Sequence, residues 1–445
     1  MPYLLLVLVA SLLVAAAPGS ATSTASAATS LYSAYPSWSD LVAGARTALY
    51  PPLTRLSDPG TEEDPSYSGF WWYGLEQFSP KGSLALAMRV HIQNQPIRPT
   101  DVADVGFYDL RFGTGWHKIG ETHAWNYQQG ARLQWRPNSD EILWNDRADD
   151  GKSYVTRVYD VAAGQIVRTL PRPIYAVSPD GRYALTHDFD RARKPDVRYC
   201  DALYPEDCIP DQDCPPDEAA KAAPDCTGVW KMDLETGQAE LIMSLARMAS
   251  EADPAELLGF RKLWIMRESW NPSGTRILVF VKGGLNQAWT MAPDGSDARA
   301  VYDTPSHQTW LDDTTILEGH GFALYDDVSG DPSAGFLFEN GPPNAHVTGI
   351  GTAGFGSALP NHDWVLADTY SIPRQYLFLY HRPTGTFVPL AALPSTAEDG
   401  INRVDLQART SPDGRTVTID STYEGLGRQL YTLDIGYILD NPPTG

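Results

Sequence analysis

The histidine in the stretch ETHAWNYQQGARLQW, residues 121–135, is the first side chain whose type and setting could do chemistry. His123 stands among aromatic and amide side chains, just ahead of a strand-like run. An imidazole titrates near neutral pH, so it can act as a general base or a general acid under physiological conditions. A histidine that only caps a strand or bonds a main-chain carbonyl fits the same stretch, and the sequence leaves both roles open.

The motifs of several common enzyme classes are absent from the chain. It contains no G-x-S-x-G, H-E-x-x-H, Walker or dinucleotide-binding signature, so hydrolases of those types, zincins and nucleotide enzymes are unsupported. The formal net charge of -21 opposes binding to nucleic acid or to anionic membranes through long-range repulsion. An acidic substrate stays compatible with this charge, because a few arginines inside a cleft can set the local potential.

The N-terminal sequence MPYLLLVLVASLLVAAAPGSATSTASAA has the apolar core and the small residues of a secretory signal. We expect residues 1–29 to be a signal peptide with a low-complexity segment, and residues 30–445 to form one secreted, extracellular domain, most simply a monomer. A membrane anchor needs ~20 apolar residues, and no later stretch supplies such a run.

All four cysteines, Cys200, Cys208, Cys214 and Cys226, lie in one segment rich in proline and aspartate. In a secreted chain an even, local cluster most simply forms two disulfides that staple a long loop. CxxC spacing is missing and no histidine lies among the cysteines, which disfavours a metal site there. The connectivity does not follow from the sequence.

Turn motifs of one kind recur along the chain, each just before an alternating apolar and polar run. Proline presets φ and glycine accepts positive φ, so such a turn followed by alternation predicts a β-hairpin. The repeats predict an all-β fold, a seven-bladed β-propeller with four strands in each blade. The seven units begin with SPKG at 79, RPNSD at 136, SPDG at 178, NPSG at 271, WLDD at 310, PNHD at 360 and SPDG at 411.

The longest interval between these turns, from residue 178 to residue 271, holds the cysteine segment and one helical candidate, AELIMSLARMASEADPAELL. We therefore expect a disulfide-stapled loop and a short helical insertion in or after one blade. The histidines are scattered among different units, and a propeller would bring such side chains together at its central axis.

Several segments, above all HAWNYQQGARLQW and YAVSPDGRYALTHDFDRAR, carry a resemblance to a known enzyme group. The chain resembles seven-bladed propeller polysaccharide lyases, over roughly residues 70–436. The similar groups are the fungal L-rhamnose-α-1,4-D-glucuronate lyases that act on gum arabic and the related ulvan lyases. Both cleave a bond that joins rhamnose to O4 of glucuronate.

The resemblance implies a catalytic group of His123, Tyr175 and Arg191. In β-elimination a base removes the C5 proton beside a uronate carboxylate, a cation neutralises that carboxylate, and an acid protonates the leaving O4. Arg191 would bind the carboxylate, His123 would be the base, and His123 or Tyr175 would protonate O4. Packing of Tyr175 in the core, and ion pairs of Arg191 with Asp188 or Asp190, are the structural alternatives.

Further residues are assigned to the substrate site on the same basis. Asn126 and Asn145 could help to bind the carboxylate, and Trp125 and Arg193 could form its walls. The ulvan lyases carry a second histidine where this chain has EILWND, and Asn145 lies nearest that place. This departure favours the rhamnose-glucuronate group over the ulvan lyases.

The resemblance also implies a divalent cation, Ca or Zn, near the central channel, with no organic cofactor. His307 and His362 each begin a later unit and are the predicted ligands. The carboxylates of Asp368, Asp405 and Asp420 are the alternative, because calcium prefers oxygen ligands. Hydrogen-bonded structural histidines fit these positions too.

The sequence thus predicts a secreted polysaccharide lyase that acts on a uronate-containing polysaccharide of the gum arabic or arabinogalactan type. It would cleave the rhamnose-glucuronate linkage by β-elimination and leave an unsaturated glucuronate. An endo-acting ulvan lyase is the alternative enzyme. A non-catalytic propeller that binds a carbohydrate or a protein is the alternative from another class.

Overall fold

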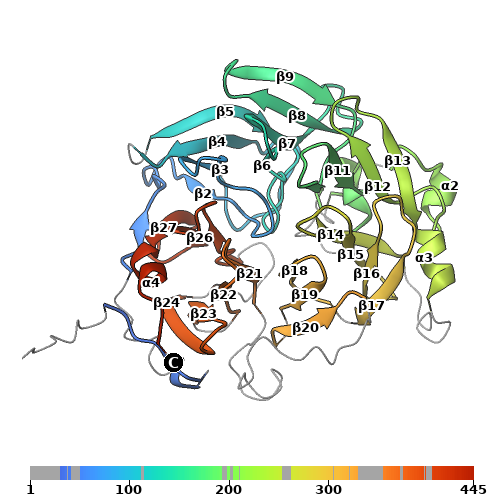
Figure 1. The fold of residues 1–445 in the computed structure, drawn as a ribbon. Coiled ribbons are helices and arrows are strands. Elements are labelled where there is room, and N and C mark those ends of the chain that lie inside the picture. Colours follow the sequence, from blue (N-terminus) through green and yellow to red (C-terminus); the bar gives the residue numbers. More distant parts are fainter. Residues whose placement is uncertain are drawn as a thin grey trace, which may run out of the picture. The chain divides into compact units, whose positions relative to one another are not determined.

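The computed structural model describes residues 31–37, 39–41, 51–111, 115–192, 198–200, 204–209, 211–252, 262–303, 305–319, 321–328, 354–370, 374–394, 396 and 403–444. The predicted signal peptide and low-complexity segment, residues 1–29, lie outside them. Residues Tyr32–Gly445 form one compact unit. Its strands make seven antiparallel sheets set around a common axis, so the predicted seven-bladed propeller is confirmed (Figure 1).

The first four blades have four strands each, in chain order from the axis to the rim. The first blade comprises β2 (Tyr67–Gly69), β3 (Leu84–Val90), β4 (Ala103–Asp109) and β5 (Trp116–Thr122). The second comprises β6 (Gln134–Trp135), β7 (Glu141–Arg147), β8 (Tyr154–Asp160) and β9 (Gln165–Leu170). The third comprises β10 (Ala176–Val177), β11 (Tyr183–Thr186), β12 (Gly228–Asp233) and β13 (Ala239–Ser244). The fourth comprises β14 (Trp264–Trp270), β15 (Ile277–Lys282), β16 (Gln287–Met291) and β17 (Arg299–Asp303).

The last three blades are less uniform. The fifth shows three strands in the described part of the chain: β18 (Gln308–Trp310), β19 (Thr315–Glu318) and β20 (Ala323–Asp326). The sixth comprises β21 (Gly356–Ala358), β22 (Trp364–Asp368), β23 (Arg374–His381) and β24 (Thr386–Pro394). The seventh comprises β25 (Arg409–Thr410), β26 (Thr416–Ser421), β27 (Gln429–Asp434) and, from the N-terminal side, β1 (Thr54–Arg55).

Helices are few and short. The described part of the chain includes the 3-10 helices η1 (Phe189–Arg191) and η3 (Pro205–Asp207) and the α-helices α2 (Pro216–Ala219), α3 (Leu245–Glu251) and α4 (Gly436–Asp440). The helical candidate at residues 239–258 was only partly right. Its first six residues are strand β13, because they pair with β12 as the outer edge of the third blade, and the helix α3 begins after the Ser244 cap.

The recurrent turns connect the first and second strands of the blades, as predicted, and they also join neighbouring blades. Gly181, in the turn before β11, has φ of +75°. A Cβ atom at this position would lie 2.3 Å from the carbonyl oxygen of Pro137, in the corresponding turn of the second blade. Glycine is therefore required there both for its backbone conformation and for close approach of two blades. We call the side of the propeller that carries these turns the turn face.

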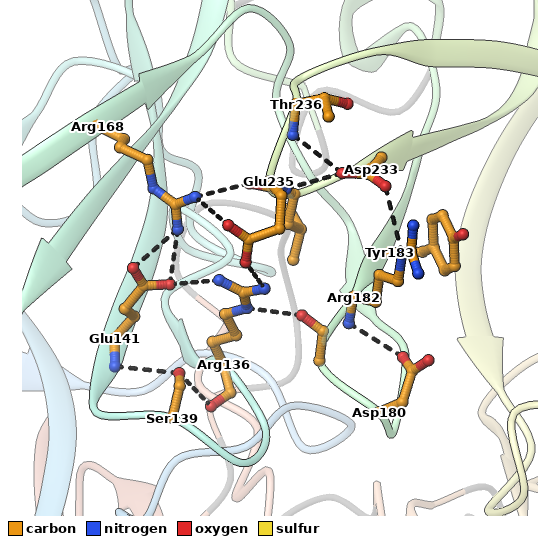
Figure 2. A network of polar contacts seen from close by, with 12 residues as sticks. Arg136, Ser139, Glu141, Arg168, Asp180, Arg182, Tyr183, Asp233, Glu235 and Thr236 are labelled. Carbon is orange, nitrogen blue, oxygen red and sulfur yellow. Dashed lines mark hydrogen bonds and ion pairs between the residues drawn. The ribbon is translucent and has the colours of Figure 1, made fainter.

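An ionic network at the turn face joins the second and third blades (Figure 2). Glu141 of β7 accepts hydrogen bonds from Arg136 at 2.6 Å and from Arg168 at 2.8 Å. Both arginines also pair with Glu235, in the turn between β12 and β13. Arg136 further donates to the carbonyl oxygen of Gly181 at 2.6 Å. Two guanidinium groups shared by two carboxylates hold the blades in register better than an isolated surface pair would.

The ring is closed by segments from the start of the chain. Strand β1 pairs with β27, so the seventh blade takes its outermost strand from the N-terminal side. Farther upstream, Tyr35 exchanges two main-chain hydrogen bonds with Phe387 of β24. Leu41 is fully buried and packs against apolar side chains of the fifth and sixth blades, Leu311, Leu317, Phe322, Val365, Phe378 and Phe387. The chain between residue 32 and β1 thus contributes to the core.

The four cysteines form two disulfides, Cys200–Cys208 and Cys214–Cys226, within the long connection between β11 and β12. This confirms the predicted stapled loop and supplies the connectivity. Disulfides of this kind persist in oxidising surroundings such as the exterior of the cell. In the described part of the chain, no helix has the length and apolar character needed to cross a bilayer.

Replacing Leu41 by alanine should test the contribution of the N-terminal segment. We expect Leu41→Ala to lower the free energy of unfolding by about 2–5 kcal/mol, because a fully buried leucine leaves a cavity between two blades. Urea unfolding followed by tryptophan fluorescence measures the change. Leu426→Ala, at a side chain that is 39% exposed, is the matched control and should have little effect. Equal effects of the two substitutions would contradict the assigned role.

Candidate functional site

A cavity of about 400 Å³ lies along the axis of the propeller and is lined by the inner strands of several blades. Toward the turn face its walls include Pro137, Pro179 and Pro272. At its other end lie Trp72 and Tyr73, which belong to the segment between β2 and β3. This volume is large enough for one or two sugar units, because pockets that bind small ligands usually have volumes of about 300 Å³ or more.

Trp72 and Tyr73 are held firmly in the channel. The main-chain amide of Tyr73 donates to Gln407 Oε1 at 3.1 Å, and its hydroxyl donates to the carbonyl oxygen of Gln308 at 2.7 Å. The ring of Phe355 lies 4.0 Å from the ring of Tyr73 and 6.1 Å from that of Trp72. Side chains from the first, fifth, sixth and seventh blades therefore meet here and fix one end of the cavity.

Two arginines, Arg132 and Arg267, lie beside the axial residue Trp72. Arg132 has φ of +54° and Arg267 has φ of +61°, a left-handed conformation that a residue with a side chain adopts at a cost. The pairing of β14 with β15 skips from Met266 to Ser269, which marks a bulge at Arg267 and Glu268. A bulge re-aims the side chains that it carries. Both guanidiniums lie over the ring of Trp72, at 5.3 Å and 5.4 Å.

Tyr175, at the start of the inner strand of the third blade, is 1% exposed and lines the cavity. The Arg132 guanidinium lies 3.6 Å from its ring centroid and donates to its carbonyl oxygen through Nε and NH2. Burial raises the pKa of the Tyr175 phenol to about 12, against the opposing effect of Arg132. The hydroxyl is therefore protonated at neutral pH and is available as a proton donor.

An imidazole–carboxylate pair lies beside Tyr175. His187 Nδ1 donates to Glu268 Oε1 at 2.5 Å, and both residues are buried. The His187 ring stacks on Phe189 at 4.4 Å and lies 5.3 Å from the ring of Tyr175. Glu268 lines the axial cavity. The carboxylate only accepts, so it fixes the proton on Nδ1 and orients the ring.

Four buried polar atoms around this cluster have no hydrogen-bond partner within the described residues: Tyr175 Oη, Arg132 NH1, Arg267 Nε and Glu268 Oε2. An unsatisfied buried polar group costs about 1–3 kcal/mol, so several in one place call for an external partner. Two guanidinium donors suit a carboxylate, and a hydroxyl beside a carboxylate suits an alcohol. The cluster is thus complementary to a ligand that carries both groups, as a uronic acid does.

Arg191 was predicted to bind a substrate carboxylate, but the structure gives its guanidinium other partners. It donates to four main-chain carbonyl oxygens, those of Leu263, Ala219, Lys221 and Ala222. These bonds tie the end of the disulfide-stapled insertion to the start of β14. Arg191 therefore anchors the insertion, and it is not among the residues that line the axial cavity.

His123 also lies outside the axial cavity. His123 directly follows β5, the outer strand of the first blade. Its side chain is 42% exposed, and its Nδ1 lies 3.6 Å from Asp146 Oδ1. Its carbonyl oxygen accepts from Arg147 Nε at 3.2 Å. The structure thus does not gather His123, Tyr175 and Arg191 around one pocket, and only Tyr175 lies at the axis.

Three of the predicted substrate-binding residues are buried and used internally. Asn145 is fully buried; its amide donates to the carbonyl oxygen of Ile174 and to Tyr199 Oη, and its Oδ1 accepts from the amide of Ile174. Trp125 donates to the carbonyl oxygen of Asp101 at 2.7 Å, and Asn126 Oδ1 accepts from two amides of its own turn. These side chains cannot touch a polysaccharide in this conformation. Arg193 lies outside the described residues.

His307 and His362 do not form a joint metal site. His307 Nε2 lies 2.8 Å from Tyr370 Oη and its ring packs on Phe355, just before β21. His362 is exposed in the turn after β21, at the opposite end of that strand. Of the alternative ligands, Asp420 already accepts four hydrogen bonds, from two amides and from Arg409 and Arg428.

In the described part of the chain, three histidine, cysteine or carboxylate donors lie close together in one place, Asp190 with Cys200 and Cys208, and those thiols form a disulfide. The described axial residues do not include such a three-donor group. The cation near the channel stays a prediction, and no chemical step is assigned to it.

The residues that sequence reasoning missed lie within segments that it had singled out. Arg132 is in the stretch 121–135, and His187 follows Tyr175 within the next block. Glu268 precedes the NPSG turn at 271 by only a few residues. The one available signal was their position, immediately before or after a predicted inner strand, where side chains face the axis.

Comparisons with known proteins support the fold. No protein-family model matches the chain, and no curated protein matches its sequence. Among solved structures, an oligogalacturonate lyase in complex with manganese is similar, with a TM-score of 0.56 and 15% identity over 86% of this chain and 92% of that one. An oligogalacturonate lyase from Vibrio parahaemolyticus is similar too, with a TM-score of 0.55 and 11% identity over 86% and 93%. At this identity the likeness concerns the propeller fold.

A buried carboxyl beside the channel predicts how stability depends on pH. Burial raises the pKa of Asp368 from 3.8 to about 7, helped by the charge of Asp405 and opposed by the Phe355 amide. Between these values the folded state holds a proton that the unfolded state releases, so stability falls as pH rises through this window. Asp368→Asn should have an unfolding midpoint close to that of wild type near pH 4, and its advantage over wild type should grow as the pH rises to 8. Parallel pH profiles of the two proteins would contradict this.

Proposed function

We propose that this protein is a polysaccharide lyase that cleaves at a uronate by β-elimination, with glucuronate linked through O4 to rhamnose as its substrate. The observation that carries the proposal is the set of unpartnered polar atoms of three residues that line the axial cavity, Arg267 Nε, Tyr175 Oη and Glu268 Oε2, with Arg132 NH1 beside Tyr175. β-Elimination needs a cation for the carboxylate, a base for the C5 proton and an acid for O4. These residue types supply all three.

Binding of the carboxylate begins the reaction. Arg267 lines the cavity and has an unpartnered Nε, so it would bind the uronate carboxylate by a charge-assisted hydrogen bond. Neutralising that charge makes C5–H more acidic, and it stabilises the negative charge that develops when the proton leaves. The bound carboxylate then offsets the free-energy cost of holding Arg267 buried in a left-handed backbone conformation.

Proton transfer follows from the same geometry. Glu268 Oε2 accepts the proton from C5, while His187 holds the other carboxylate oxygen and fixes its direction. The electron pair left at C5 forms the C4–C5 double bond, and the C4–O4 bond breaks. Tyr175 donates its proton to the leaving O4, and the nearby Arg132 guanidinium stabilises the resulting phenolate. The products are an unsaturated uronate and a rhamnose-bearing end with a free hydroxyl.

Two observations support a carbohydrate lyase over a binding propeller. The solved structures named above have a similar fold and are lyases of oligogalacturonate, which is also a uronate polymer. The acid, the base and the cation lie together on one cavity rather than spread over a surface. The proposed preference for glucuronate linked through O4 to rhamnose comes from the sequence resemblance. The proposed natural substrates are therefore arabinogalactan-type polymers such as gum arabic.

Ultraviolet absorbance of the C4–C5 double bond tests the proposal directly. The wild-type protein should generate it from gum arabic, and Tyr175→Phe and Glu268→Gln should each lower kcat about 10²–10⁴-fold, the usual contribution of a general acid or base. Arg267→Lys should mainly raise KM. Ulvan and oligogalacturonate are the parallel substrates, and a preference for either would replace the glucuronate–rhamnose assignment.

His123→Ala is the decisive comparison, because His123 is the base that the sequence resemblance implies. We expect this variant to keep most of its activity, since the ring is 42% exposed and lies off the axial cavity. Loss of activity in His123→Ala with retention in Glu268→Gln would move the site to the His123 region. Absence of product from all three polymers, with a folded wild-type protein, would leave a non-catalytic binding propeller.

A further inference from the structure

A second, smaller cavity lies under the disulfide-stapled insertion of the third blade and has a volume of about 40 Å³. Thr186 and Trp230 are cross-strand partners of β11 and β12, and both line it from the blade. Asp188, Asp211 and Asp213 line it from the insertion side. A space of this size holds one ion with one or two waters and is too small for a sugar.

The lining of this cavity is unusually rich in unsatisfied oxygen atoms. Thr186 is 1% exposed, and its hydroxyl has no hydrogen-bond partner within the described residues. Asp211 Oδ2 is likewise buried without a partner in the described structure. Asp188 Oδ1 caps η1 by accepting from the amides of Asp190 and Arg191, which leaves Oδ2 without a hydrogen bond from any described group. Two buried oxygen atoms of different residues thus lack donors, and Asp188 Oδ2 offers a third oxygen beside them.

Charge at the cavity is also unbalanced. Its lining carries three carboxylates and one guanidinium, and that guanidinium, Arg172, is bound by both oxygens of Asp213. Asp188 and Asp211 lie close enough for their negative charges to repel each other, and the charge of Arg191 opposes this repulsion. A cation between the two carboxylates would remove both the repulsion and the shortage of donors.

The insertion holds Asp211 in place before any ligand arrives. Asp211 lies between Cys208 and Cys214, which belong to different disulfides. The amide of Ile209 donates to Asp190 Oδ2, and the amide of Cys214 donates to the carbonyl oxygen of Asp211. The position of the Asp211 carboxylate is therefore fixed from both sides, and ligand binding need not order the loop.

We propose that this cavity is a calcium site, with the carboxylates of Asp188 and Asp211 and the hydroxyl of Thr186 as protein ligands. The remaining ligands of the ion are water molecules and main-chain carbonyl oxygens, as is usual for a hard cation with six to eight oxygen ligands. The site is separate from the axial cavity, and His187, which also lines it, lies between the two. Its existence does not depend on the lyase activity.

Terbium is the probe of choice, because Trp230 lines the same cavity and can transfer excitation energy to a bound lanthanide. The purified full-length protein, stripped with EDTA, should show sensitised terbium emission that calcium displaces. Calcium alone should raise the thermal unfolding midpoint by several degrees, because a ligand that binds only the folded state stabilises it. Neither measurement uses a substrate, so failure here and failure of the lyase proposal are distinguishable.

Three variants sharpen the test. Asp211→Asn should abolish both the emission and the calcium-dependent rise in midpoint, and Thr186→Val should weaken calcium affinity at least ~10-fold. Trp230→Phe should lose the emission but keep the calcium-dependent rise. Asp217→Asn, at an exposed carboxylate of α2, is the control and should behave as wild type. Unchanged emission in Asp211→Asn, or no calcium effect on the wild-type midpoint, would overturn the proposal.

Discussion

The buried carboxylate of Asp420 is the interaction on which the arrangement of the channel depends. It is fully buried in β26 and accepts four hydrogen bonds, from the amides of Phe70 and Trp71 and from the guanidiniums of Arg409 and Arg428. Those two amides begin the segment that carries Trp72 and Tyr73 to the axis. One side chain of the last blade thus fixes the path of the first blade's connection, and with it one end of the axial cavity. Removing the carboxylate would leave two buried guanidiniums without a counter-charge, which is far more damaging than loss of a surface pair.

Left-handed residues and unpartnered buried polar atoms occur in several parts of the structure, and one group of them lies at the axis. Left-handed residues at Arg132 and Arg267, and polar atoms without partners at Tyr175 and Glu268, each lower the stability of the folded state. Toward the rim, the third and fourth strands of several blades pair with a bulge, and ionic networks such as the one around Glu141 join neighbouring blades. A protein tolerates such a concentration of strain when function selects it, so the location of the unsatisfied groups is itself an argument for where the ligand binds.

The turn chemistry made the fold predictable, because a proline, a glycine and the alternation after them act within a few residues of one another. The seven second strands all lie where those turns placed them. The site was less predictable, because its contacts join blades. His187 and Glu268 are 81 residues apart, and the bulge that contains Glu268 has no signature in the local sequence. The predicted roles of Asn145 and Arg191 in binding the substrate carboxylate also depended on contacts between distant segments, which the local sequence does not show. Their side chains are used by an insertion whose path over the blade depends on two disulfides and many main-chain contacts.

The closure of the ring also constrains how the chain can fold. Thr54 and Thr432, which meet where β1 joins β27, are 378 residues apart in sequence. The entropy lost in bringing such distant segments together is regained only when the whole ring is present, so the seventh blade must be the last to form. Until then the edge of β27 stays open to pairing with another chain. The same delay keeps the growing chain from closing its ring until residues 429–434 of β27 have been synthesised.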